Sequence, residues 1–374
     1  MRTLLITGPG GSGRTTTAAA TALTAAREGA RTLLLGTDRT DTLGPVLGIG
    51  ATPRLTVRRV DPDTDFRTDL AALQDRAASA LDLLGASRLE PEETSPLPGA
   101  EELAVLRALR DATLSEDTYD LVVVDLPPTP RALSLLALPE ELRRYLRRLL
   151  PPERQAARAL RPVLGRLAGV PMPAEWLYGT AARLDLQLAA VEAVLADRDT
   201  VVRLVAEPGR GGGLALRGLR TDALIATRVL PESEAAGWLA GPVAQQRKAL
   251  EEWRESYDVR PVAHLGRDPR GTDDLAALAV PGVTTRPATV DWPVTDHLAD
   301  DGVLVWHIPL PGARRDELDL IRRGDEIVVT AGPFRRIVPL PSALRRCTVA
   351  GAALREDELR IRFRPDPALW PRTH

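Results

Sequence analysis

Lysine is nearly absent from this chain of 374 residues. Lys248 is the only lysine among 49 basic residues, so almost every positive charge is an arginine. We attribute the scarcity to coding bias, because alanine, leucine, proline and glycine are abundant. The scarcity still matters at any phosphate site that needs a compact ammonium group, since arginine and lysine are not interchangeable there.

Cysteine and histidine are also scarce. The single Cys347 excludes a disulfide within one chain, and it excludes a thiolate cluster for zinc, arsenite or an iron–sulfur centre. The four histidines, His264, His297, His307 and His374, are scattered without metal-binding spacing. We therefore expect no metal centre built from these side chains.

Excess positive charge and long apolar runs are missing as well. The 49 basic and 51 acidic residues leave a net charge of −2, so no overall positive field favours nucleic acid or anionic lipid. The start of the sequence has no charged leader before a cleavable apolar stretch. No run approaches the roughly 20 apolar residues of a membrane span. We expect a cytoplasmic protein without nucleic-acid partners or stable membrane insertion.

The first 285 residues read as an α/β domain. Residues 2–7 and 32–35 form short apolar runs typical of strands buried on both faces, and an alanine-rich helix is predicted between them at 15–28. Residues 119–125 (YDLVVVD) form the clearest buried strand. This order of elements predicts a right-handed βαβ unit in a doubly wound, mostly parallel sheet. Residues 139–199 are predicted to be a helical insertion, with breaks at Pro151-Pro152 and around residues 171–173.

The character of the chain changes near its end. Residues 286–301, rich in proline, threonine and aspartate, read as a linker, and residues 302–374 as a separate all-β domain. In residues 359–363, apolar and basic side chains alternate, which is typical of a half-buried antiparallel strand. We interpret Arg360, Arg362 and Arg364 as a solvated sheet face, with a docking surface for an acidic partner as the alternative.

A glycine-rich loop follows the first predicted strand and precedes the first predicted helix. Its sequence, GPGGSGRT at 8–15, has the GxxxxG-basic-Thr frame of a phosphate-binding loop. Glycines allow several backbone N–H groups to point at one phosphate chain, and the helix N-terminus adds its dipole. The alternative is a glycine turn before an ordinary helix. The predicted nucleotide-binding residues here are Gly8, Gly10, Gly11, Ser12, Gly13, Arg14, Thr15 and Thr16.

The loop resembles GKGGVGKTT of the arsenite-pump ATPase family, which includes the ATPases that deliver tail-anchored membrane proteins. Three further segments match in the family's order: 36–43 (GTDRTDTL) resembles switch I, 125–131 (DLPPTPR) resembles DTAPTGH, and 222–232 (DALIATRVLPE) resembles DAVVVNRVLPE. Residues 302–374 resemble the α-crystallin-like, small-heat-shock type domain of some bacterial members. The resemblance implies a P-loop NTPase sheet followed by a β-sandwich.

The resemblance also implies roles for particular residues. ATP and Mg²⁺ are the implied cofactors. Asp38 would be the catalytic switch I carboxylate that orients the attacking water, although an aspartate that caps a turn is the alternative. Thr15 and Asp125 would serve the Mg²⁺, Asp125 through water, and Thr227 stands where an asparagine reads adenine. The implied partners are a second ATPase chain, in a homodimer or heterodimer, and a protein client on residues 139–199; ordinary helix packing is the alternative there.

Four departures from the family pattern predict slow hydrolysis. Pro9 replaces the lysine that reaches across the dimer, Arg14 the P-loop lysine, Pro130 a switch II glycine, and Thr227 the adenine-reading asparagine. Loss of one phosphate contact costs ~10²- to 10³-fold in rate. We predict a nucleotide-binding hydrolase whose dimer rearranges with nucleotide. The alternative is a pseudo-ATPase that acts as a structural or regulatory subunit beside an intact homologue. A partition or cell-division ATPase fits poorly, because the chain ends in β-structure.

Overall fold

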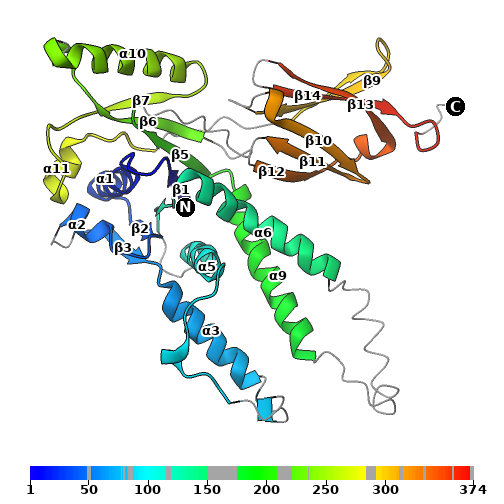
Figure 1. Cartoon of the computed structure of the whole chain (residues 1–374), viewed down its shortest axis with the longest axis horizontal. Helices are drawn as coiled ribbons and strands as arrows, with labels where there is room; N and C mark the ends of the chain where they lie inside the picture. The colour runs from blue at the N-terminus through cyan, green and yellow to red at the C-terminus, as the bar shows by residue number, and fades with distance from the viewer. Residues whose placement is uncertain are drawn as a thin grey trace. The chain divides into compact units, whose positions relative to one another are not determined.

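The computed structural model divides the chain into two compact units (Figure 1). The first unit contains residues 1–207, 225–231 and 260–283, and the second contains residues 208–224, 232–259 and 284–374. The structure describes all residues except 49–51, 77, 79–80, 83–86, 115–118, 150–174, 209–220, 235, 284–291, 311–314, 332–333, 356–357 and 371–374.

A seven-stranded sheet in the order β3-β2-β4-β1-β5-β6-β7 organises the α/β part. β1 pairs in parallel with β4 and β5, and β2 pairs in parallel with β3 and β4. The predicted α/β fold class is confirmed. The strands are β1 (Arg2–Thr7), β2 (Thr32–Gly36), β3 (Leu55–Arg59), β4 (Leu121–Asp125), β5 (Thr200–Ala206), β6 (Thr221–Val229) and β7 (Val259–Ala263).

Sequence patterns identified the central strands β1, β2 and β4 and missed the two edge strands. β2 and β4 are buried at every position, as their apolar runs predict. β5 is also buried throughout, although its sequence contains Arg203. In contrast, β3 (LTVRR) is mostly exposed and β7 (VRPVA) is only partly buried. An edge strand tolerates charged residues and proline, so neither segment has the apolar run that indicates a strand.

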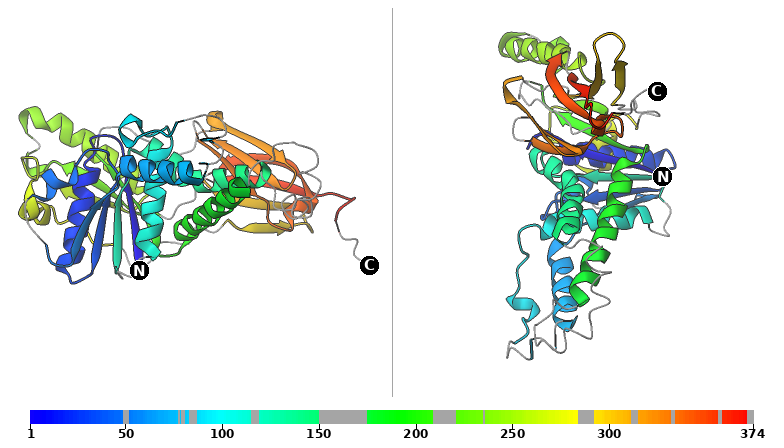
Figure 2. Two further views of the ribbon diagram at one scale, coloured as in Figure 1. Left: turned by 90° about the horizontal axis from the view of Figure 1, so that it is seen from below. Right: turned by 90° about the vertical axis from the view of Figure 1, so that its right-hand side faces the viewer.

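Helices flank the sheet on both faces (Figure 2). α1 shows why the alanine-rich sequence suits this position, because Ala18, Ala19, Ala20 and Ala22 are fully buried and allow close packing on the strands. None of the described helices is both long and apolar enough to cross a membrane. The helices are α1 (Arg14–Arg27), α2 (Leu43–Leu47), α3 (Pro62–Arg76), α5 (Ala100–Leu114), α6 (Thr129–Leu149), α9 (Glu175–Ala196), α10 (Ala240–Arg254) and α11 (Gly271–Ala277).

The predicted helical insertion corresponds to α6 and α9. α6 begins at Thr129, ten residues before the predicted start, and buries Pro139 inside the helix. The two helices pack together, and Arg143 of α6 pairs with Asp185 of α9 at 3.0 Å. The predicted breaks at Pro151-Pro152 and residues 171–173 lie outside the described residues.

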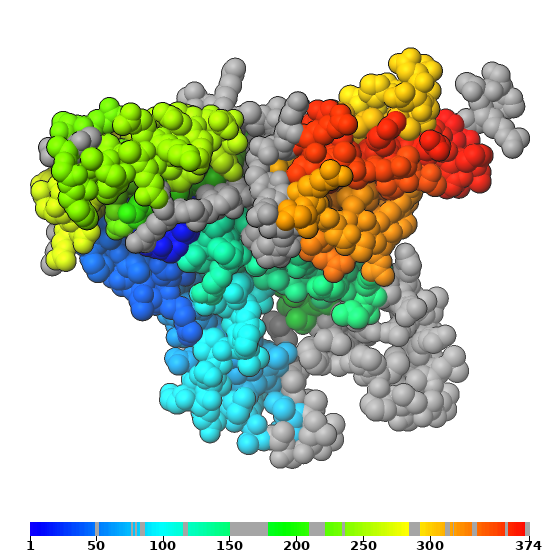
Figure 3. Space-filling model, turned by 45° about the horizontal axis from the view of Figure 1, so that its top comes forward, coloured from blue at the N-terminus to red at the C-terminus, as the bar shows by residue number. Residues whose placement is uncertain are grey.

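α10, yellow-green in Figure 3, lies at the surface, where Lys248 pairs with Glu252 at 3.9 Å.

The C-terminal part consists of two antiparallel sheets, in the orders β10-β11-β12 and β13-β14-β9-β8. Trp306 and Phe363 are at the centre of its hydrophobic core. Leu359, Ile361 and Phe363 are buried between more exposed arginines, so the predicted alternation is confirmed. The strands are β8 (Val294–His297), β9 (Val303–Pro309), β10 (Leu318–Arg323), β11 (Glu326–Ala331), β12 (Phe334–Pro339), β13 (Cys347–Arg355) and β14 (Glu358–Pro365).

Candidate functional site

The carboxyl ends of β1 and β4 lie side by side in the middle of the sheet. The parallel register pairs Ile6 of β1 with Asp125, the last residue of β4. The glycine-rich loop leaves β1 directly after this point and leads into α1. Parallel sheets bind ligands outside the carboxyl ends of their strands, where the strand order reverses. The fold therefore brings the predicted phosphate loop next to the predicted Mg²⁺-serving carboxylate.

The backbone of the loop requires glycine at two positions. A Cβ at Gly8 would lie 1.9 Å from the carbonyl oxygen of Val205 on β5, much closer than any real contact. Gly13 has a φ of +85° and caps the start of α1, and the α1 amide of Thr17 donates to the Gly13 carbonyl at 2.8 Å. By contrast, a Cβ at Gly10 would meet no atom within 4 Å. The loop is thus pressed against β5 at one end and open in its middle.

Hydrogen bonds join this loop to the segment that follows β4. The Leu126 amide donates to the Ile6 carbonyl at 2.9 Å, and the Thr129 amide donates to the Gly8 carbonyl at 3.1 Å. Thr129 begins α6, so Pro130 lies in the first turn of that helix. The first helical amides have no intrahelical acceptor, so proline breaks no helical hydrogen bond there. This explains how the helix accommodates Pro130.

The Arg14 side chain turns toward the end of β4. Its Nη1 atom donates to the carbonyl of Leu126 and lies 3.8 Å from Oδ1 of Asp125. The Arg14 side chain is 10% exposed and the Asp125 side chain 1%. Burial raises the pKa of Asp125 to about 6, and the nearby Asp38 charge adds to this, whereas the Thr15 hydroxyl and Arg14 oppose it.

Buried polar atoms without a hydrogen-bond partner gather around this pair. Among the described residues, five of the seven such atoms are here: Ser12 Oγ, Arg14 Nε, both carboxylate oxygens of Asp125, and Thr129 Oγ1. Native proteins rarely leave buried polar groups unsatisfied, so this concentration indicates a polar ligand. The oxygen donors of Thr15 and Asp125 suit Mg²⁺, and the N–H donors of the loop suit phosphate.

Asp38 follows β2 and is half-buried. The hydroxyl of Thr42 donates to its Oδ2 at 3.3 Å, and the hydroxyl of the preceding Thr37 donates to the carbonyl of Asp125 at 2.7 Å. The neighbouring segments therefore tie the ends of β2 and β4 together. Asp38 is therefore close enough to raise the pKa of Asp125 by charge repulsion.

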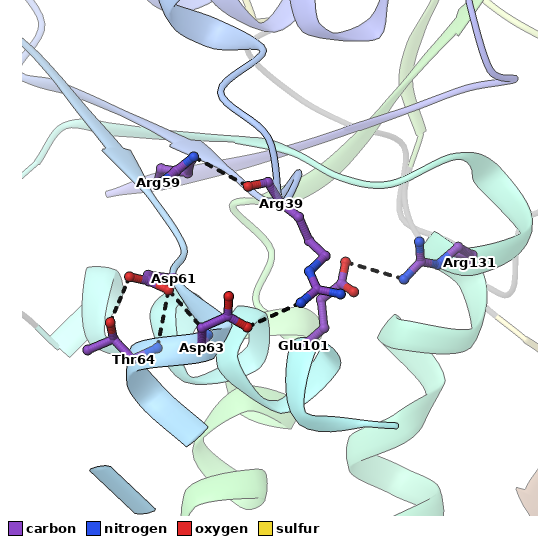
Figure 4. A network of polar contacts seen from close by, with 7 residues as sticks. All are labelled: Arg39, Arg59, Asp61, Asp63, Thr64, Glu101 and Arg131. Atoms are coloured by element: carbon purple, nitrogen blue, oxygen red, sulfur yellow. Dashed lines mark hydrogen bonds and ion pairs between the residues drawn. The ribbon is translucent and has the colours of Figure 1, made fainter. Parts of the chain in front are cut away.

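Ion pairs anchor the segments that surround Asp38 and the start of α6 (Figure 4). Arg39 pairs with Asp63 of α3 at 3.2 Å, and Arg59 of β3 donates to the Arg39 carbonyl at 3.3 Å. Arg131 of α6 pairs with Glu101 of α5 at 3.3 Å. These contacts join residues far apart in the sequence, and no local pattern indicated them.

A cavity of about 360 Å³ adjoins the loop at Gly13 and Thr16. Thr227 lines it, but the Thr227 hydroxyl donates to the Ser12 carbonyl at 2.7 Å and so supports the loop. The next residue, Arg228, has a left-handed backbone with a φ of 54°. Arg228 lies within the motif at 222–232, but the local pattern did not indicate its role. Residues from the segment 262–270, which no motif marks, also line the cavity.

Arg228 contacts the loop directly. Its Nη1 atom donates to the carbonyl of Gly11 at 3.2 Å and to Oε2 of Glu207 at 3.2 Å.

Pro9 is half-buried at the start of the loop, and its ring offers neither a charge nor an N–H. Throughout the described part of the chain, no group of three or more histidine, cysteine, aspartate or glutamate side chains is arranged for a metal ion.

Comparisons with known proteins agree with this two-part organisation. Residues 1–279 match the family described as an anion-transporting ATPase, and residues 301–363 match an HSP20-like domain found in ArsA. An uncharacterized protein of Streptomyces coelicolor is 72% identical, with 100% of both chains covered. A protein of Aquifex aeolicus, named as an arsenical pump-driving ATPase, is 25% identical over 96% of this chain and 99% of its own.

Small heat-shock proteins are among the similar solved structures. AgsA from Salmonella typhimurium, in a C-terminally truncated form, matches 23% of this chain and 97% of its own at 16% identity and a TM-score of 0.18.

Proposed function

Because the chain belongs to the anion-transporting ATPase family, we propose that it binds ATP with Mg²⁺ at residues 8–15, hydrolyses it slowly, and couples nucleotide occupancy to rearrangement of a dimer. The observation that carries this proposal is the concentration of unsatisfied buried polar atoms at the loop. The adjoining cavity of about 360 Å³ supports it by offering space for a nucleoside next to the phosphates.

Each predicted site residue has a role in this proposal. The backbone N–H groups of residues 10–13, together with Arg14 and Thr15, hold the phosphates. Thr15 and, through water, Asp125 would hold Mg²⁺, which would neutralise phosphate charge. Asp38 orients the attacking water by accepting its hydrogen bond. Slow hydrolysis follows from Pro9 and Pro130, which remove one charged group and one backbone donor from the family pattern.

Calorimetric titration with Mg-ATP tests the proposal. We expect binding by the wild type and at least about tenfold weaker binding by Thr15→Ala, which loses a hydroxyl beside Asp125. Thr24→Ala is the matched control, because Thr24 lies on the same helix but outside the loop. Wild-type affinity in Thr15→Ala would contradict the assignment of the loop.

A pseudo-ATPase is the second candidate. Pro9, Pro130 and the burial of Arg14 against Asp125 favour it, because all three weaken phosphate handling while leaving the glycine loop intact. In this case the chain is a structural or regulatory subunit, in a homodimer or beside an intact homologue. It predicts nucleotide binding without turnover. Ordinary turnover by the isolated wild type, with no gain from Pro9→Lys, would exclude it.

A protein client would be the further partner of the proposed ATPase. Tyr145, Leu149 and Leu186, on α6 and α9, are at least half exposed, and such apolar side chains are suited to contact with another protein. Met172, the methionine in the predicted client segment, lies outside the described residues. Cross-linking in cells from position 186, compared with exposed position 252 on α10, tests whether this face contacts a client. We expect a client adduct from position 186 and none from position 252, and equal cross-linking from both would contradict a client on this face.

A further inference from the structure

The Arg14 side chain contacts the end of β4 and the residue after it, not the glycine-rich loop. One nitrogen, Nη1, donates to the Leu126 carbonyl and faces Oδ1 of Asp125 at 3.8 Å. A guanidinium stays charged at every physiological pH, so it is a permanent cation at this carboxylate. The planar fork gives arginine several donors in fixed directions, which allows one side chain to serve two acceptors at once.

Asp125 is the carboxylate that would serve Mg²⁺ in the proposed function. It is almost fully buried, and the groups that favour its charged form are the Thr15 hydroxyl and the Arg14 guanidinium. A buried carboxylate requires a cation nearby, and removal of that cation leaves an uncompensated charge. Because Arg14 already supplies one, a second cation at the same carboxylate would meet repulsion from the guanidinium.

The Nε atom of Arg14 is a further hydrogen-bond donor of this side chain. It is buried and has no acceptor, although the side chain begins in the first turn of α1, directly after the loop. A phosphate on the loop would offer an acceptor to an N–H donor in this position. Arginine can therefore connect a phosphate with Asp125, a connection that a lysine ammonium makes poorly because it is a point charge on a flexible stem.

We infer that Arg14 is a built-in cation that bridges nucleotide phosphate and Asp125, so that the site takes metal-free nucleotide nearly as well as the Mg²⁺ complex. The inference rests on the proposed nucleotide site and specifies which form of nucleotide that site accepts. Arg14 is a specificity-determining residue in this account, and its exchange for lysine restores the site's preference for the metal complex.

The experiment is calorimetric titration of the full chain with ADP, once in Mg²⁺ and once in EDTA. We expect the wild-type dissociation constants to agree within about threefold, whereas Mg²⁺ tightens binding to Arg14→Lys at least about tenfold. The control is Arg31→Lys. Arg31 also pairs with an aspartate, Asp120, at 3.2 Å, but this pair is exposed at the opposite end of β4. The Arg31→Lys variant should retain the wild-type ratio of the two dissociation constants.

A second substitution keeps the test independent of Arg14→Lys. Asp125→Asn removes the carboxylate that both cations need, so the double variant Arg14→Lys/Asp125→Asn should lose the Mg²⁺ preference and still bind ADP in EDTA. A wild-type preference for Mg²⁺ of tenfold or more, or an unchanged ratio in folded Arg14→Lys, overturns the inference. Absence of ADP binding to every variant, with and without Mg²⁺, instead overturns the proposed nucleotide site.

Discussion

Ionisation of Asp125 lowers the stability of the folded chain. Burial raises its pKa from 3.8 in the unfolded chain to about 6. The penalty is therefore absent below pH 3.8, grows as the pH rises, and is complete above pH 6. We expect the effect of Asp125→Asn on the free energy of unfolding to be about 2 kcal/mol more favourable at pH 8 than at pH 4, because only ionised Asp125 carries the penalty. Urea unfolding measures both differences, and equal differences would contradict this explanation.

Arg228 combines backbone strain with a supporting contact. Its φ of 54° is unfavourable for any residue with a Cβ, whereas its side chain holds the Gly11 carbonyl. Arg228→Gly and Arg228→Ala both lose this contact, but only glycine relieves the strain. We expect Arg228→Gly to be more stable than Arg228→Ala by about 1 kcal/mol in urea unfolding. ADP binding should weaken in both variants. Equal stability of the two would show that the backbone is unstrained.

Sequence patterns located the glycines and Asp125, because a loop between a buried strand and a helix is a local signal. They did not indicate the direction of Arg14 or the support from Arg228. Both depend on which strands become neighbours: β4 lies beside β1, and β6 carries Arg228 to the loop. Contacts between distant segments leave no mark in local spacing, so these residues emerge only from the folded chain.

The loop between β1 and α1 also fits tightly at the scale of the element. Gly8→Ala would place a Cβ 1.9 Å from the Val205 carbonyl, which cannot move without disturbing β5. We expect this variant to lose more than about 2 kcal/mol of unfolding free energy. Gly10→Ala is the matched control in the same loop, because open space surrounds it, and it should lose under about 1 kcal/mol. Thermal unfolding compares the two, and similar losses would refute the close approach to β5.

Periodicity predicted elements well where burial is uniform. The runs at 2–7 and 119–125 match β1 and β4, since central parallel strands need apolar residues on both faces. It failed at β3 and β7 because edge strands need no such run. It also placed the start of the helical insertion at Pro139, which the structure buries within α6. Tertiary packing there outweighs the usual disfavour of proline inside a helix.

At the scale of the whole molecule, the C-terminal sheets have a core of their own. Phe363 is fully buried and its ring lies 6.5 Å from that of Trp306. Phe363→Ala should therefore destabilise this part by about 3–5 kcal/mol. Scanning calorimetry should show a lowered transition for the C-terminal part, with ADP affinity unchanged. A uniform shift of all unfolding, or loss of ADP binding, would mean that the two parts fold as one cooperative unit.

The resemblance to the arsenite-pump ATPases predicted both parts of the molecule, and the family matches at 1–279 and 301–363 confirm it. The resemblance succeeded because it draws on four ordered motifs and a C-terminal pattern that local propensities could not connect. The boundaries 1–285, 286–301 and 302–374 remain predictions, as do the dimer, the client and the cytoplasmic location.

Titration of the full chain with ATP, in the presence of Mg²⁺ and with turnover recorded in the same sample, tests the central claim most directly. The account predicts one nucleotide bound per chain and slow release of phosphate. Absence of binding at millimolar ATP, in Mg²⁺ and in EDTA alike, would contradict it.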